Sequence, residues 1–83
     1  MAHAEVLIKA VHIFVEISRH EQKKVEFPTD QVTGQQIKTE AGVPLDNDLA
    51  RRQGQKLELV TNDQIITIKD GEHFVSLPPG TIS

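Results

Sequence analysis

Apolar and polar residues alternate in residues 11–17, which predicts a β-strand with two different faces. Successive side chains of a strand point to opposite sides of a sheet, so every second residue shares a face. One face holds Ile13, Val15 and Ile17, and the other holds His12, Phe14 and Glu16. We expect the aliphatic face to cover the core and Phe14 to lie on the open side of the sheet.

A second alternating segment, residues 23–27, follows a polar break at residues 18–22. Val25 and Phe27 are its apolar members and are expected to face inward. Two such segments joined by a short polar link predict a β-hairpin. Pro28 ends the second strand, because a proline has no backbone N–H to donate to a neighbouring strand.

A short helix is predicted to begin after Thr33, whose hydroxyl can cap it while Gln36 reaches back to the cap. Gly42 stands where a left-handed residue commonly ends a helix, and Pro44 follows two residues later. The narrow apolar face of this helix consists of Val32, Ile37 and Ala41. A helix this short is marginal in water, so we expect it to pack on the sheet.

Further strands are predicted after the helix, and they decide the fold class. The segments are residues 49–53, 56–60, the apolar stretch 65–68, and residues 73–77, which Pro78 and Pro79 end. A hairpin, one helix and then more strands predict an α+β fold, specifically a ubiquitin-like β-grasp. In that fold a mixed sheet of four to five strands packs on one short helix. A ferredoxin-like half or another small α+β roll also fits the periodicity.

The predicted domain covers residues 11–77. Residues 1–10 form an N-terminal tail or an extension of the first strand, and residues 78–83 form a C-terminal tail. Eighty-three residues are enough for one small domain, and without cysteine it has neither a disulfide nor a thiolate metal site. The net charge is −3, and no cluster of basic residues indicates nucleic-acid binding. No apolar run is long enough to span a bilayer. We expect a cytoplasmic location.

Three segments together resemble the bacterial multi-ubiquitin domain family: residues 33–37, 41–44 and 68–74. Members of that family are ubiquitin-like domains from operons that also encode activating-enzyme, conjugating-enzyme and deconjugating-peptidase relatives. The resemblance covers residues 11–80 and implies a β-grasp fold, those three kinds of partner, and a role in defence against phage. It implies a protein modifier rather than an enzyme, with no cofactor.

For a modifier, the resemblance implies that the C-terminal carboxylate of Gly80 is joined to a target. Glycine suits this end because it has no Cβ and can enter a narrow catalytic channel. Cleavage between Gly80 and Thr81 would remove residues 81–83. Pro78 and Pro79 would keep the segment that leads to Gly80 extended. The alternative is that Pro78, Pro79 and Gly80 only end the last strand.

Other candidate sites are weaker. The histidines lack the spacing of a zinc site, and no serine, histidine and carboxylate arrangement indicates an active site. Arg51 and Arg52 either form a docking patch for an acidic partner or belong to an ordinary solvated face. Phe14 either begins a recognition patch or is covered by residues 1–10 or by a bulge.

These residues leave two further functions open. A binding module that is never conjugated would dock a partner on the sheet around Phe14 and Arg51. A small sulfur carrier is the third possibility, but such carriers resemble one another in ending on a bare diglycine, which this chain lacks.

Overall fold

The computed structural model describes residues 10–80 as a small α+β domain with one helix and a mixed five-stranded sheet. Nearly all of the predicted N-terminal tail, and residues 81–83, therefore lie outside the described residues. The elements in chain order are β1 (Val11–Ser18), β2 (Glu21–Phe27), β3 (Gln31–Thr33), α1 (Gly34–Ala41), β4 (Asp48–Gln53), β5 (Lys56–Leu59), β6 (Ile65–Thr67) and β7 (Glu72–Leu77).

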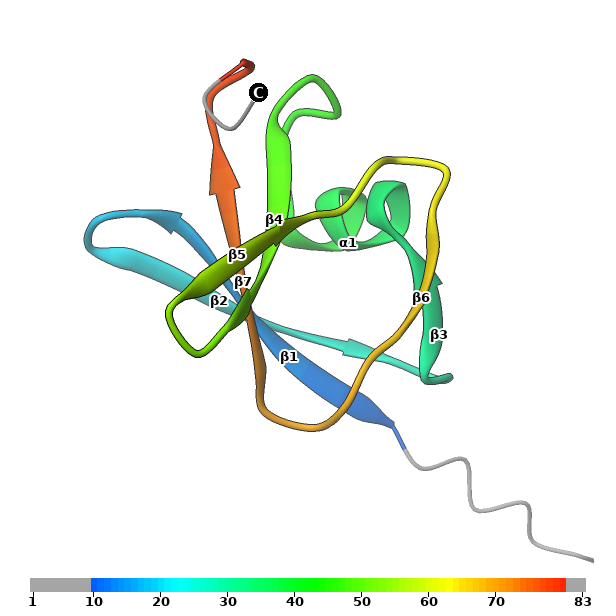
Figure 1. Cartoon of the computed structure of the whole chain (residues 1–83). Helices are drawn as coiled ribbons and strands as arrows, with labels where there is room; N and C mark the ends of the chain where they lie inside the picture. Colours follow the sequence, from blue (N-terminus) through cyan, green and yellow to red (C-terminus); the bar gives the residue numbers. More distant parts are fainter. Residues whose placement is uncertain (1–9, 81–83) are drawn as a thin grey trace, which may run out of the picture.

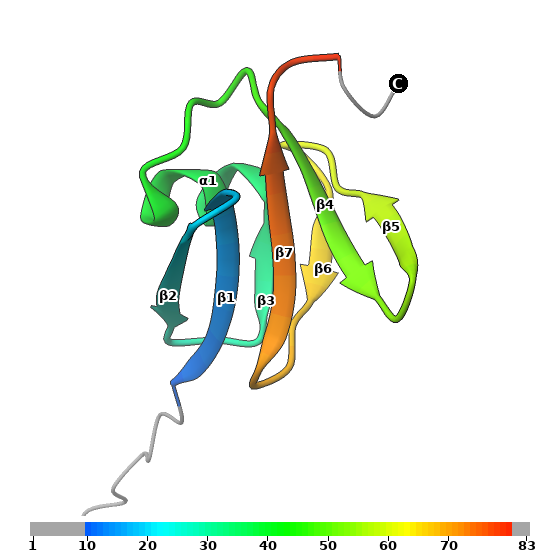
Figure 2. The ribbon, with the colours of Figure 1, turned by 90° about the vertical axis from the view of Figure 1, so that its left-hand side faces the viewer.

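The large sheet has the strand order β2-β1-β7-β4-β5, and its centre is a parallel pair, β1 with β7. All its other neighbours pair antiparallel. Figures 1 and 2 show α1 and the small β3–β6 pair together on one side of this sheet. The opposite side, which we call the open face, carries no helix or strand of residues 10–80.

The alternation predicted for the first hairpin is confirmed. Ile13 and Val15 are completely buried, and Val25 and Phe27 on β2 are nearly so. The pairing of β1 with β2 places Ile13 opposite Val25, so the apolar residues of both strands share the face that meets the helix. The remaining core side chains come from β3, α1, β4, β6, β7 and the loops next to them, whereas every residue of β5 is exposed. They are Val32, Ile37, Ala41, Val43, Leu49, Val60, Ile66, Ile68 and Phe74.

Both predicted ends of the helix are confirmed. The Thr33 hydroxyl accepts from the backbone N–H of Gln36 at 3.2 Å, and the Gln36 side-chain oxygen accepts from the N–H of Thr33 at 2.8 Å. Gly42 ends the helix with φ 73°, a conformation that costs glycine little. Lys38 is buried as well, and its ammonium donates to the carbonyl oxygen of Leu45 at 3.1 Å and to Oδ1 of Asn62 at 2.7 Å. The helix is thereby tied to the loops before β4 and before β6.

Strand β3 was not predicted, and Val32 belongs to it rather than to the helix. Val32 lies opposite Ile66 of β6, and the backbone N–H of Ile68 donates to the carbonyl of Asp30 at 2.7 Å. A strand of three residues is too short to show an alternating pattern, so its pairing depends on contacts distant in sequence. No helix in the described part of the chain is long and apolar enough to cross a membrane.

Gly34 is the position where the helix approaches another loop most closely. A Cβ built on Gly34 would lie 2.3 Å from the backbone oxygen of Thr61 and 2.9 Å from its carbonyl carbon. The neighbouring N–H of Gln35 donates to the carbonyl of Asn62 at 3.1 Å, so the loop cannot move away without losing this bond.

We therefore expect Gly34→Ala to lower the free energy of unfolding by about 2 kcal/mol or more, because overpacking forces the backbone apart. Urea denaturation followed by circular dichroism measures the change. Gln35→Ala is the control, since Gln35 is exposed on the same helical turn. Equal stability of Gly34→Ala and the unmodified chain would contradict the close approach.

Candidate functional site

The C-terminal end of β7 is the first candidate site. After Leu77 the chain continues through Pro78, Pro79 and Gly80, all three exposed. Because β1 and β7 run parallel, this exit lies at the opposite end of the sheet from the start of β1 (Figure 2). A Cβ on Gly80, which has φ 81°, would meet no atom within 4 Å. Thr81, the other half of the predicted cleavage site, lies outside the described residues.

Phe14 lies on the open face, as predicted, and is flanked by two histidines. Its ring stacks on His73 of β7, with centroids 5.2 Å apart and planes at 23°. The His12 ring meets it edge-on, with centroids 5.7 Å apart. Phe14 is half-buried between them, so an aromatic surface rather than an isolated ring faces outward.

The open face continues from this aromatic group toward β5. Directly opposite residues in antiparallel strands point to the same side, so His73 shares a face with Arg52, and Arg52 shares it with Leu57. By the same argument, Val75, Ala50 and Leu59 also point to this face.

The residues that share the open face on β7, β4 and β5 become more exposed toward β5. Ala50 and Val75 are buried although they are separate from the main core, whereas Leu57 and Leu59 are 47% and 43% exposed. The open face therefore carries an apolar row that ends on an edge strand.

Arg51 and Arg52 do not form one patch, because neighbouring residues of β4 point to opposite faces. Arg52 lies on the open face, half-exposed, with Nη2 3.9 Å from Oε1 of Glu16. Arg51 points to the helix side, where its side chain is 12% exposed and its Nε lies 3.3 Å from Oε2 of Glu72. The sequence-based docking patch is corrected on this point: Arg52 is available on the surface and Arg51 is internal.

Arg51 joins three elements on the helix side. Its Nη2 donates to the carbonyl oxygen of Thr67 at 2.6 Å, and its guanidinium carbon lies 5.5 Å from the centroid of the Phe74 ring. Together with Glu72, these contacts hold the end of β6 and the start of β7 against β4. Arg51 therefore contributes to the packing of the domain on the helix side of the sheet.

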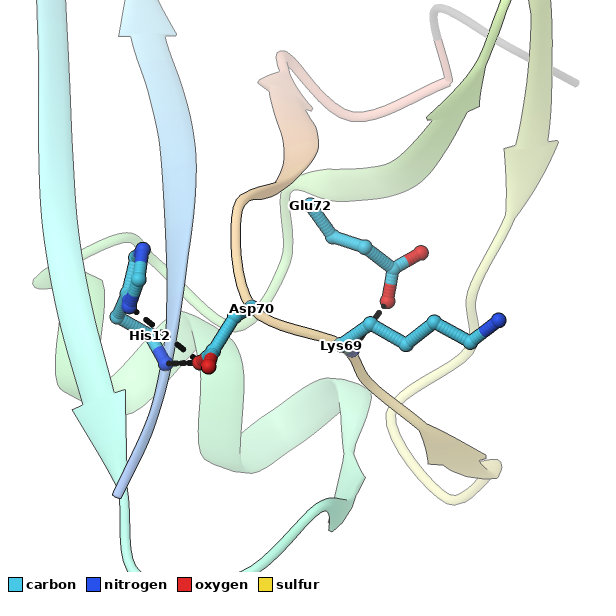
Figure 3. Close-up of polar contacts among 4 residues, drawn as sticks. All are labelled: His12, Lys69, Asp70 and Glu72. Atoms are coloured by element: carbon cyan, nitrogen blue, oxygen red, sulfur yellow. Dashed lines mark hydrogen bonds and ion pairs between the residues drawn. The ribbon is translucent and has the colours of Figure 1, made fainter. Parts of the chain in front are cut away.

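The turn before β7 is held by two carboxylates, drawn in Figure 3. Oδ1 of Asp70 accepts from the backbone N–H of His12 at 3.0 Å and lies 3.3 Å from His12 Nδ1. Oε1 of Glu72 accepts from the backbone N–H of Lys69 at 2.8 Å. Gly71, with φ 83°, donates its N–H to the carbonyl of His12 at 2.9 Å. Residues 68–74 thus have a structural role, which is to dock the beginning of β7 beside β1.

Leu57 and Leu59 were not singled out from the sequence. Their alternation with Lys56 and Glu58 is visible there, but alternation alone does not reveal that β5 is an edge strand. Residues 10–80 contain no group of three or more histidine or acidic side chains placed to hold a metal ion. Comparisons of the chain with protein-family models, curated proteins and solved structures find no match.

The two ion pairs on β4 predict different effects on stability. We expect Glu72→Gln to lower the free energy of unfolding by about 1–3 kcal/mol, because it leaves the guanidinium of Arg51 largely buried and without its counter-charge. Glu16→Gln, which removes the exposed partner of Arg52, should cost less than about 0.5 kcal/mol. Chemical denaturation of both variants at neutral pH makes the comparison. Equal losses would contradict the internal position of Arg51.

Proposed function

We propose that this chain is a ubiquitin-like β-grasp protein that is conjugated to target proteins through Gly80. The observation that carries the proposal is the exit of the chain: a central strand ends in an exposed segment of two prolines and a glycine. The strand order, with its parallel central pair and one helix on one side, supports the β-grasp assignment.

In the proposed pathway this chain is the substrate of other enzymes. A peptidase hydrolyses the bond between Gly80 and Thr81, which leaves a carboxylate on Gly80 and releases residues 81–83. An activating enzyme adenylates that carboxylate with ATP and releases pyrophosphate, and an enzyme cysteine then displaces AMP to form a thioester. An amine or hydroxyl of the target attacks the thioester carbonyl and releases the thiol. The chain itself contains no cysteine, so the thiols of this pathway belong to its partners.

The exit segment differs from the extended approach that the two prolines predict, because Pro79 and Gly80 form a turn and Gly80 has φ 81°. The fixed φ of each proline still restricts the segment, which lowers the entropy lost when an enzyme binds it. Gly80 adds no side chain next to the carbonyl carbon that is attacked. The open face, with Phe14 and Arg52, is the proposed docking surface for the pathway enzymes, which would act in the cytoplasm.

A binding module that is never conjugated is the second candidate function. It is favoured by the aromatic group of Phe14, His12 and His73 on the open face, which the exit segment does not explain. In this alternative Pro78, Pro79 and Gly80 only end the last strand.

The conjugation proposal predicts the outcome of replacing Gly80 by valine. We expect Gly80→Val to abolish covalent adducts when the chain is co-expressed with its activating, conjugating and peptidase partners. The fold of residues 10–77 should be kept, because a Cβ at Gly80 meets no atom within 4 Å and the strain of a side chain at φ 81° falls on the exposed segment after β7. Intact-mass spectrometry of the recovered protein measures both the loss of residues 81–83 and the adducts.

Ser83→Val is the matched control, since it makes a similar change beyond the proposed cleavage position and should leave adducts intact. Unchanged adduct formation by Gly80→Val would overturn the role of Gly80. A full-length mass without adducts in the unmodified chain would favour the binding module instead.

The binding module predicts a different pattern. Deletion of residues 78–83 should then leave partner affinity within about twofold, while Phe14→Ala should weaken it about tenfold or more, as loss of a central aromatic contact does. Titration of each variant into the same purified partner enzyme by calorimetry tests this. Ile65→Ala is the control, because Ile65 is 70% exposed but lies on the small β3–β6 sheet.

A further inference from the structure

Strand β5 is an edge of the large sheet that presents apolar side chains to solvent. Among residues 10–80, no strand pairs with its outer side. The large exposed hydrophobic side chains of this part of the chain are Leu45, Leu57, Leu59 and Ile65, so two of the four belong to this four-residue strand. The other edge strand, β2, contains none of them. An exposed apolar edge is a template for pairing with another strand.

The hydrogen-bonding pattern shows which backbone groups of β5 face outward. Lys56 lies opposite Gln53 across a two-residue turn, and the N–H of Val60 donates to the carbonyl of Leu49 at 2.8 Å. In an antiparallel ladder the hydrogen-bonded pairs alternate, so Lys56, Glu58 and Val60 bond to β4. The N–H and C=O groups of Leu57 and Leu59 therefore point away from the sheet.

We propose that β5 binds β5 of a second copy of this chain, antiparallel, about a two-fold axis that passes beside Leu57. In this register Leu57 lies opposite Leu57 of the second copy, and the two residues exchange a pair of backbone hydrogen bonds. Lys56 then lies opposite Glu58 of the second copy, and Glu58 opposite its Lys56. Both charged pairs lie on the helix side of the sheet, while the leucines meet on the open face.

Charge selects this register over its nearest competitor. A shift that centres the pair on Glu58 would place two like charges directly opposite each other, which is unfavourable. If residues 56 and 58 were both lysine, two copies of β5 would repel each other in this register. With Lys56 and Glu58, each charge instead faces the opposite charge of the second copy. The dimer would form one sheet of ten strands, five from each copy, and join the two open faces. The inference does not depend on Gly80.

The first test is sedimentation equilibrium of the full 83-residue chain. A strand-to-strand interface is small, so we expect a weak dimer that forms between about 10 µM and about 1 mM. Leu57→Lys should weaken it at least tenfold. Ile65→Lys, which places the same charge on the other exposed aliphatic surface, should leave it unchanged. A monomer at every concentration, or equal dimerisation by Leu57→Lys, would overturn the proposal.

Charge reversal tests the register. We expect Lys56→Glu and Glu58→Lys each to weaken the dimer about tenfold, because each replaces two attractive pairs by two repulsive ones. The double variant Lys56→Glu/Glu58→Lys should restore it. Mixing the two single variants should give a heterodimer, since all facing charges are then opposite. Failure of both rescues, or stronger dimerisation by Glu58→Gln, would exclude this register.

Discussion

The parallel pairing of β1 with β7 is the constraint on which the rest of this structure depends. It joins Ile13, Phe14, Val15 and Glu16 to the start of β7, more than fifty residues later in the chain. Parallel neighbours cannot be connected by a tight turn, so every element between β2 and β7 belongs to the connection. The helix and the β3–β6 pair cover one face of the sheet, and β4 and β5 extend it beyond β7. The same pairing sends the C-terminal segment out at the end opposite to the start of β1.

The register of this pair is fixed by polar contacts rather than by packing alone. A slip of one residue would move Phe74 onto the open face and His73 into the core, because side chains alternate. Asp70 and Gly71 prevent the slip by bonding to the backbone N–H and carbonyl of His12. Glu72 then places its carboxylate beside Arg51, so the turn, β4 and β6 are locked in one arrangement.

Much of this fold follows from local sequence. The alternation in residues 11–17 placed the aliphatic face in the core and Phe14 outside it, and Thr33, Gln36 and Gly42 marked both ends of the helix. Such features involve residues no more than a few positions apart, which is why pattern and capping rules detect them. The mixed five-stranded sheet on one helix agrees with the expected fold class.

The features that the sequence did not disclose all depend on distant partners. Three-residue β3 exists because β6 lies beside it. Arg51 looks like a surface residue beside Arg52 until the position of Glu72 is known. The exposure of Leu57 and Leu59 depends on β5 being the last strand of the sheet, which is a property of strand order rather than of composition.

The strand order also separates the functional elements that we propose. The exit segment continues from the centre of the sheet at β7, whereas the edge at β5 lies beyond β4 (Figure 2). Pairing at that edge uses backbone groups of Leu57 and Leu59, and conjugation uses a carbonyl carbon at Gly80. Neither process consumes a group that the other needs. A domain with this topology can therefore present its C-terminal end to an enzyme while its sheet is extended by a second copy, because the two sites share no strand.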